Sequence, residues 1–600
     1  MSCAGIPGVH MKGIWMATAA AVAALAQASS ASAADLAGRP VLKSAPPVFV
    51  SAWTFETGLR YWYSVGRFRF NLGDPFVPGQ LNSRLDYTSQ RAHAAESFFR
   101  LDHASGVFIK GLAGGGSIVA GRMNDEDFPP AAVPYSNTLQ SSRDGSLRYG
   151  GVDVGYVFWK QPMWQVEGLV GYHYWREKYN TYGCAQIAGN AGICGVVPPL
   201  FGPIPTSFNS LDQDIRVHSL RIGGAVKVNV TPQLSVRMEG AYLRSWFAGN
   251  DFHNFRPNIR GVNQSGKGDG FQLEGLVSYE VTPAFTIGAG ARWWRAETAN
   301  GRFHWENTIM GATFGVPSAP LPMALNRYGV FVQAAYTFGK TAGEAPGPVP
   351  FLPFLGAGAP RDWSGLHVGF NLGRGFGDGG GAVDAASPTA ATFQALGRLP
   401  IQQKYGTYGF LAGGQIGYDW QFGRFVAGAE VDLSYAHIAG GDGLSDINTG
   451  LFFTTRRQNI SWLGTARARL GFTPFGSTLI YATGGLAFGG VQTHSAFSSL
   501  VGGSCVAFFC SYGETSRTAT GWTIGAGMER SLTQNLSLKT EYLYVDLGRQ
   551  TTPVFSFGGA NLAGVPVDYA PRSNLRNHVF RSGLNYKFGW GGPAPVVAKY

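Results

Sequence analysis

Apolar and polar residues alternate along long stretches of the chain. From Trp53 to Val65 the odd positions are mostly apolar or aromatic, and the even positions are mostly polar or small. From Phe425 to Tyr435 the odd positions are again apolar, and the even positions include Glu430 and Asp432. Alternation over about 10 residues predicts β-strands with one apolar and one polar face. A soluble sandwich would carry more Lys and Glu on the polar face, so the pattern favours strands whose apolar face meets lipid.

Short and long connections alternate between these runs. Val-Thr-Pro occurs at Val230–Pro232 and again at Val281–Pro283, each time between two alternating segments, which predicts short turns. The other connections are longer, polar and rich in glycine. Short periplasmic turns and long external loops are typical of an outer-membrane β-barrel. We expect ten strands near 52–71, 84–102, 106–122, 145–159, 163–180, 213–230, 233–248, 270–281, 284–298 and 327–339. We expect eight more near 363–375, 407–421, 424–438, 457–472, 477–491, 517–531, 535–548 and 577–589.

The chain divides near residue 350. Tyr328–Phe338 has the aromatic end of a closing strand, and a stretch rich in Pro, Gly and Ala follows as a linker. The predicted fold is therefore all-β, with two transmembrane antiparallel β-barrels in tandem, of ten and then eight strands. The expected divisions are a signal peptide (1–33), a ten-stranded barrel (52–339), a periplasmic linker (340–361), an eight-stranded barrel (362–590) and a C-terminal tail (591–600).

The N-terminus has the pattern of a secretory signal peptide. Lys12 precedes an apolar stretch, Gly13–Ala26, and Ala31-Ser32-Ala33 matches a cleavage signal, so the mature chain is expected to begin near Ala34. The alternative is a buried apolar helix. Together with the predicted strands, this segment indicates an integral protein of the bacterial outer membrane with its loops facing outside.

Composition agrees with this class of protein. Glycine accounts for 86 of 600 residues, aromatic residues for 14% and charged residues for only 14%, which argues against a disordered chain, a coiled coil and an ordinary soluble enzyme. After the N-terminus there is no apolar run of about 18 residues, so helical membrane spans are not expected. The net charge is +11, and the basic residues are scattered along the chain and do not form a run, so nucleic-acid binding is not expected. Basic residues near the outer rim would instead meet anionic lipopolysaccharide.

Four cysteines remain after removal of the signal peptide. Cys184 lies near Cys194, and Cys505 lies near Cys510, in segments rich in glycine. In an oxidising compartment these pairs predict two local disulfides that hold external loops. A metal site would need nearby histidine or further cysteine, and neither pair has it, so no metal is expected.

Two short acidic segments carry candidate chemistry. Asp125 and Asp127 follow the third predicted strand, and Asp251 and His253 follow the seventh, in each case at a spacing of two that places both side chains on one face. The alternation of the seventh strand puts Asp251 and His253 on its inward face. Strands three and seven lie nearly opposite in a ring of ten, so the two pairs would face each other across the external opening. Asp251 would orient His253 as a general base, while Asp125 and Asp127 hold a water and share a proton. The alternative is that these are polar loop residues.

The first predicted barrel resembles the omptin family of outer-membrane endopeptidases over about residues 52–339. The resemblance is carried by Ser83–Tyr87, Leu147–Val154, Gly168–Tyr172 and Gly240–Trp246, the last leading into Asp251 and His253. It implies a ten-stranded barrel with a catalytic Asp125, Asp127, Asp251 and His253, a polypeptide substrate, and no cofactor beyond lipopolysaccharide.

The resemblance also implies that outward side chains grip that lipid, and it places Tyr172 and Arg176 at such positions. Gly249 stands where the family has an acid, and Gly66–Phe70 offers no acid either. The resemblance therefore does not support the family's preference for cleavage beside basic residues.

The second predicted barrel resembles the eight-stranded family of opacity-type and porin-like outer-membrane proteins. Trp363–Gly373, Gly414–Tyr418, Ala466–Phe472 and Glu541–Asp546 carry this resemblance, over most of 361–590. A ring of eight strands is filled by its own side chains, which indicates a surface or structural module. We find no catalytic constellation in it.

Two functions remain open. One is a surface endopeptidase of the omptin type, and the alternative is a non-enzymatic outer-membrane protein that is structural, adhesin-like or porin-like. A diffusion porin is the weaker alternative because neither barrel has enough strands for a wide lumen. Retention of Asp125, Asp127, Asp251 and His253 favours the enzyme, and loss of the acidic specificity groups favours the alternative.

Overall fold

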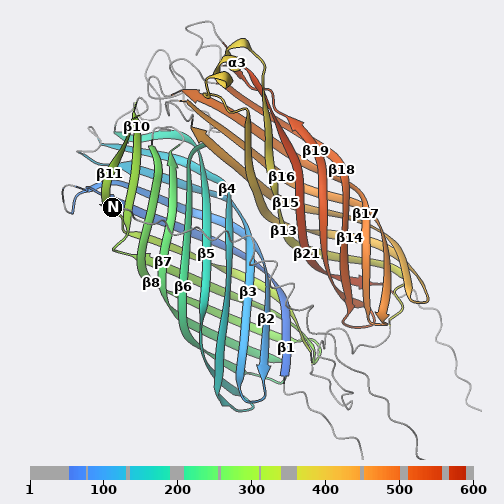
Figure 1. The fold of residues 1–600 in the computed structure, drawn as a ribbon. Coiled ribbons are helices and arrows are strands. Elements are labelled where there is room, and N and C mark those ends of the chain that lie inside the picture. Colours follow the sequence, from blue (N-terminus) through green and yellow to red (C-terminus); the bar gives the residue numbers. More distant parts are fainter. Residues whose placement is uncertain are drawn as a thin grey trace, which may run out of the picture. The chain divides into compact units, whose positions relative to one another are not determined.

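The computed structural model describes residues 53–75, 77, 79–129, 135–189, 209–253, 259–309, 312–338, 361–445, 452–499, 511–556 and 566–588. Within these ranges the chain forms two antiparallel β-sheets and one short helix (Figure 1). The predicted signal peptide, the linker as far as Pro360 and the tail lie outside the described residues.

The first sheet contains a ring of ten strands. β1 pairs with β2 and with β12, each later strand up to β9 pairs with the strand before it, and β9 pairs with β12. The ring comprises β1 (Trp53–Gly73), β2 (Leu81–His103), β3 (Val107–Asp127), β4 (Ser136–Lys160), β5 (Trp164–Gly189), β6 (Asn209–Asn229), β7 (Leu234–His253), β8 (Ile259–Glu280), β9 (Phe285–Thr298) and β12 (Met323–Phe338). The predicted number of ten strands is confirmed.

The strands extend further at the external end than the sequence pattern predicts. The eighth strand was expected at 270–281 and begins at Ile259, and a hairpin of β10 (Arg302–Ile309) and β11 (Ala312–Pro320) continues the sheet beyond β8. These extensions are polar or rich in glycine and proline, so they lack the alternation that marks the lipid-facing parts. The connections 104–106, 161–163, 230–233 and 281–284 are short and share one end, which identifies the periplasmic end.

The second sheet contains a ring of eight strands, as predicted. β13 pairs with β14 and β21, and β17 pairs with β18 to complete the ring. The ring comprises β13 (Gly365–Ala385), β14 (Gln402–Phe422), β15 (Phe425–Ser445), β16 (Phe452–Phe475), β17 (Thr478–Ser499), β18 (Ser511–Ser531), β19 (Leu536–Thr551) and β21 (Tyr569–Lys587). The short β20 (Phe555–Ser556) pairs with β18.

The sequence pattern did not predict the helix α3 (Pro388–Ala395) between β13 and β14. The Ser387 hydroxyl accepts a hydrogen bond from the backbone N–H of Ala390, and proline stands in the first turn, so the local chemistry favours a helix start. No helix in the described ranges is long and apolar enough to cross a membrane.

Side chains point outward or inward as the alternation predicts. On β15 the side chains of Val431, Leu433 and Tyr435 are exposed, whereas Glu430 and Asp432 are buried. Both rings thus turn an apolar face outward, as a strand in contact with lipid requires. Exposed apolar residues on the first ring include Val154, Tyr156, Phe158, Val170, Tyr172, Leu220, Ile222, Met238, Tyr242, Trp246, Leu273, Val277, Ile287, Trp293, Tyr328, Val330 and Val332. We call this surface the apolar band.

The periplasmic half of the first ring contains a cavity of about 500 Å³ with many charged side chains in its lining. Charged groups from distant strands are paired in its walls. Arg292 contacts both Glu96 and Glu274 at 2.7 Å, and Arg237 contacts Glu167 at 2.8 Å. Buried charges are tolerated when they are paired in this way. Because the apolar side chains point outward, the charged side chains point inward, and the ion pairs neutralise them there.

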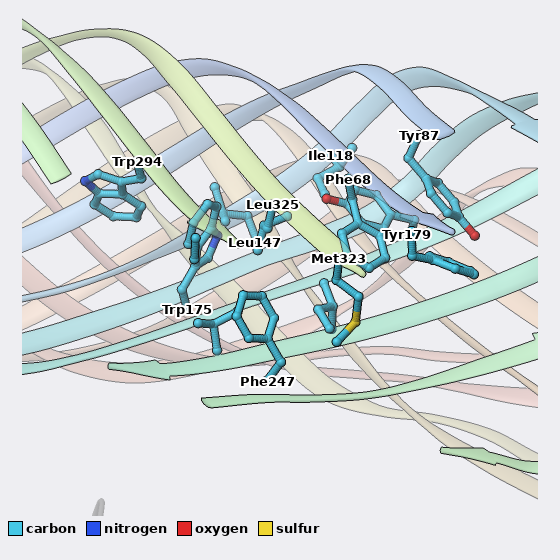
Figure 2. Packing of buried hydrophobic residues seen from close by; sticks show 14 of the residues in the cluster. Phe68, Tyr87, Ile118, Leu147, Trp175, Tyr179, Phe247, Trp294, Met323 and Leu325 are labelled. Carbon is cyan, nitrogen blue, oxygen red and sulfur yellow. The ribbon is translucent and has the colours of Figure 1, made fainter. Parts of the chain in front are cut away.

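An apolar cluster fills the ring above this cavity (Figure 2). In its lower part Trp62 contacts Trp294 in a tilted arrangement, with ring centroids 4.8 Å apart, and Trp294 also lines the cavity. Its upper part stacks Tyr87 on Tyr179 at 4.9 Å. Because β2 and β5 are three places apart in the ring, the second contact crosses the lumen. The cluster separates the cavity from the external end.

A network of buried ions and an apolar cluster together fill the second ring. Glu541 accepts hydrogen bonds from Arg467 at 3.0 Å, from Arg581 at 2.7 Å and from the Tyr481 hydroxyl at 3.1 Å. Lys539 lies 3.4 Å from the same carboxylate. The filled interior agrees with the small lumen that a ring of eight strands allows.

We expect the protein to form no open channel, because the apolar cluster blocks the first ring and the ion network fills the second. Full-length protein inserted into planar lipid bilayers should give no conductance steps above those of the detergent control. Stable ohmic steps that scale with the amount of protein would contradict this expectation.

The ion network of the second ring should be sensitive to the loss of a single charge. Glu541→Gln removes the anion that three cations share, and breaking a buried ion pair costs about 3–5 kcal/mol. We therefore expect a lower urea midpoint for unfolding in detergent, followed by tryptophan fluorescence. The control Ile524→Val changes an outward side chain and should shift stability by no more than about 0.5 kcal/mol. Equal midpoints for both variants would show that Glu541 does not stabilise the ring.

Candidate active site

Asp125 and Asp127 lie on the last residues of β3, at the external end of the first ring. Asp125 is the register partner of Leu85 on β2, and Asp127 is the register partner of Ser83. Leu85 and Ser83 are both buried, and the Ser83 hydroxyl donates a hydrogen bond to Asp125 at 3.5 Å. The two carboxylates therefore belong to the inward face of the strand.

β-Bulges just below this level give Asp125 and Asp127 their direction. On the lower part of β3 the inward residues are even-numbered, ending with Ile118, whereas Met123 begins an inward set of odd positions. Each strand gains one residue here: β2 between Thr88 and Arg91, where Ser89 has φ 54°, in the left-handed region, and β3 between Ile118 and Ala120. A bulge adds one residue and so exchanges the two faces of a strand. Without it, both carboxylates would point to the outer surface.

Asp251 lies on β7, four places from β3 around the ring. It is 1% exposed, and it continues the inward odd positions Leu243, Ser245 and Phe247, as the sequence predicts. His253 ends β7 and its backbone pairs with Leu211, while its side chain lies outside the described part of the structure. The predicted pairs thus begin on opposite walls of the same opening.

The electrostatics of Tyr87 link the two walls. Tyr87 lies at the external side of the apolar band. Its register partner on β1 is Phe68, which pairs with Leu325 on β12. Leu325 lies nearer the external end than Tyr328, the last apolar-band residue of that strand. Burial raises the pKa of the Tyr87 hydroxyl well above its usual value, and the charges of Asp251 and Asp125 raise it further. Carboxylates from both walls therefore act on one group at the floor of the opening.

Uncharged polar side chains occupy the inward positions around these acids. Gln213, the register partner of Asp251, and Gln264 are buried and exchange hydrogen bonds of 2.8 and 3.1 Å. Thr181 donates to Gln140 at 2.6 Å. The sequence pattern did not single out these residues or Tyr87 as part of the site. Tyr87 belongs to the segment Ser83–Tyr87, which carries part of the family resemblance and could have drawn attention to it. That its side chain points inward depends on the bulge, which the sequence pattern does not reveal.

Glu177, an inward carboxylate below the site, is fully engaged. Arg327 donates two hydrogen bonds of 2.6 Å to Glu177, and the Trp175 indole N–H donates a third at 2.9 Å. The Tyr179 hydroxyl donates a fourth. Glu177 is therefore neutralised and cannot bind a further cation.

Tyr172 and Arg176, the predicted lipopolysaccharide contacts, both lie on the outward face of β5. The Tyr172 hydroxyl forms a 2.5 Å hydrogen bond with His218. Arg176 binds Asp214 through two nitrogens, at 2.5 and 2.8 Å, and Arg216 contacts the same carboxylate at 3.0 Å. Two arginines thus share one acid, which leaves a net positive charge at this place on the outer surface.

Of the predicted disulfide cysteines, the structure describes only Cys184, and it is disulfide-bonded. Cys194, Cys505 and Cys510 lie outside the described residues. In the ranges that the structure describes, no group of three or more ligating side chains could hold a metal ion.

The inward acids suit the activation of water. Two carboxylates at a spacing of two can hold a water molecule and share a proton, and a third acid opposite can orient a base. These residues need no bound metal for that chemistry.

Comparison with known proteins identifies the second sheet. Residues 349–588 match the model of the outer membrane protein beta-barrel domain. The chain is 33% identical over 257 residues to the 31 kDa outer-membrane immunogenic protein of Brucella melitensis, covering 41% of this chain and 94% of the relative. It is 36% identical over 144 residues to the 22 kDa outer membrane protein of Rhizobium leguminosarum, covering 23% of this chain and 54% of the relative.

Among solved structures, the chain is similar to the outer membrane protease OmpT from Escherichia coli. The identity is 15%, the match covers 48% of this chain and 97% of OmpT, and the TM-score is 0.40. At that score the likeness carries no argument about function. The family match, the named relatives and the all-β fold together place the protein in the bacterial outer membrane. The chain belongs to the family of outer-membrane proteins that includes the 31 kDa outer-membrane immunogenic protein of Brucella melitensis.

Proposed function

We propose that the first ring is an outer-membrane endopeptidase that hydrolyses peptide bonds with a water activated between two pairs of residues. One pair is Asp125 with Asp127, and the other is Asp251 with His253. The observation that carries this proposal is the inward direction of three carboxylates at the external end, from strands on opposite sides of the ring. Ordinary polar loop residues would not require the bulge that turns Asp125 and Asp127 inward.

The proposed reaction uses His253 as the general base. The water oxygen bonds to the substrate carbonyl carbon, its proton passes to the imidazole, and the carbonyl π electrons move onto oxygen. The C–N bond then breaks, and the proton passes to the leaving amine. Asp251 orients the imidazole and stabilises its positive charge, and Asp125 with Asp127 holds the water.

Lipopolysaccharide is the proposed lipid partner. The net positive charge of Arg176, Asp214 and Arg216 lies on the outer surface near Tyr172, which belongs to the apolar band. Basic groups beside an aromatic belt suit the phosphates of an anionic lipid. The assays below therefore use protein folded with lipopolysaccharide.

A second candidate is a non-enzymatic surface protein. The relatives are named as outer-membrane immunogenic proteins, and their names give no catalytic activity. The filled interiors of both rings also suit a structural module. This candidate requires that the inward acids of the first ring have no role in hydrolysis, and the following experiment distinguishes the two.

Asp125→Asn and His253→Ala should each lower peptide cleavage by at least about a hundredfold, because each removes a group that handles the water or its proton. Cleavage is measured by mass spectrometry on a broad peptide library with the full-length protein. The matched control is Asp269→Asn, which changes an outward carboxylate paired with Arg244 and should leave cleavage unchanged. Heat-modifiable migration on gels checks folding. If folded wild-type protein cleaves no peptide, the non-enzymatic candidate stands.

The same library should show a preference for apolar over basic residues beside the cleaved bond. The inward side chains at and below the level of Asp125 include Phe70, Leu85 and Met123, all nearly fully buried. The nearest carboxylate below them, Glu177, is already bound by Arg327. An apolar wall rejects a charged side chain that has no partner, so apolar residues should be favoured by about tenfold or more. Preferred cleavage beside Arg or Lys would contradict this expectation.

A further inference from the structure

Tyr87 lies at the floor of the proposed active site, with its ring held firmly in place. The residue is fully buried; its ring stacks on Tyr179 at 4.9 Å and packs at a tilt against Phe68 at 6.0 Å. Figure 2 shows that its hydroxyl points away from the cluster, beyond Phe68 and Met323. The aromatic contacts thus fix the direction of the hydroxyl group without using its hydrogen-bonding capacity.

The Tyr87 hydroxyl has no hydrogen-bond partner among the described residues. Buried tyrosine hydroxyls usually find a partner, and leaving one without a partner costs free energy. Such a group calls for an explanation, and a bound ligand that completes the hydrogen bond is one. Two of the acids that raise the pKa of this hydroxyl, Asp125 and Asp251, belong to the proposed site, so the ligand would be the reacting peptide or water.

Several other uncharged side chains beside the acids already form hydrogen bonds with protein groups. The Ser83 hydroxyl donates to Asp125, Gln213 and Gln264 bond to each other, and Thr181 donates to Gln140. The Tyr87 hydroxyl, by contrast, can donate to a substrate without breaking any hydrogen bond that the described residues form.

We infer that Tyr87 is a further catalytic residue, whose phenolic O–H donates a hydrogen bond to the oxyanion that forms when water attacks the peptide carbonyl. The inference rests on the proposed function. When the new C–O bond forms, the former carbonyl oxygen takes up the π electrons and becomes negative. Tyr87 keeps its proton throughout, and the hydrogen bond is released when the C–N bond breaks and the carbonyl is restored.

The charges of the site explain why such a donor is needed. Asp125, Asp127 and Asp251 all face the opening, so a developing oxyanion would be repelled by negative charge unless a donor lies beside it. A fixed donor aimed at the place where charge develops stabilises the transition state more than the ground state. Burial and the nearby carboxylates keep the pKa of the Tyr87 hydroxyl high, so it remains a donor at neutral pH.

Tyr87→Phe tests this role because it removes only the hydroxyl. In full-length protein folded with lipopolysaccharide, kcat for a peptide chosen from the library should fall by about 10²–10³-fold, as for loss of one oxyanion donor, while KM changes by less than about twofold. The matched control is Tyr149→Phe, at a buried tyrosine of the same apolar cluster that packs against Trp62 and Trp294 nearer the periplasmic end. It should keep the wild-type kcat. Thermal unfolding in detergent checks that both variants are folded.

The outcomes separate the inference from the proposed function. If wild-type protein cleaves peptides, Asp125→Asn abolishes cleavage and Tyr87→Phe retains the wild-type kcat, the inference is wrong and the proposed function stands. Equal losses of kcat in Tyr87→Phe and Tyr149→Phe would also overturn the inference, because they would indicate a general effect on the cluster. If wild-type protein shows no cleavage that depends on Asp125, both the proposed function and the inference fail.

Discussion

The pairing of the first strand of each ring with the last is the constraint on which the rest of the structure depends. β1 pairs with β12, and β13 pairs with β21, so no strand of either ring is left with an open edge over its paired length. In lipid an unpaired backbone group has no water to bond to, which makes this closure necessary. Closure also assigns every side chain to the inside or the outside. Because the outside must be apolar, the inside receives the charged residues and has to pair them.

The first ring meets that requirement in two different ways along its length. The periplasmic half pairs arginines with glutamates around a cavity, whereas the external half is packed with aromatic and aliphatic side chains. The change of interior has a chemical consequence at the external end. Asp125, Asp127 and Asp251 stand above this apolar floor, at the external end of the ring.

Much of the fold could be predicted from the sequence, because period-two alternation states directly which face meets lipid. The strand numbers of both rings and the inward direction of Asp251 followed from it. The bulges did not, because one added residue at Ser89 leaves the local pattern of apolar residues almost unchanged while it exchanges the two faces. Ion pairs such as Arg327 with Glu177 join residues far apart in the sequence, and no local pattern records them. The α3 helix was missed because it is a single short segment with no apolar periodicity.

The family assignment and the proposed activity rest on different parts of the chain. The domain model begins at residue 349, and the candidate site lies before residue 254. Membership of the family therefore neither supports nor opposes hydrolysis by the first ring. Support for hydrolysis is local: a bulge turns two carboxylates inward, a third faces them from the opposite wall, and a tyrosine hydroxyl below them has no hydrogen-bond partner in the part of the chain that the structure describes. Each of these features costs free energy in a ring that serves only as an anchor, and together they are what a site for charged intermediates requires.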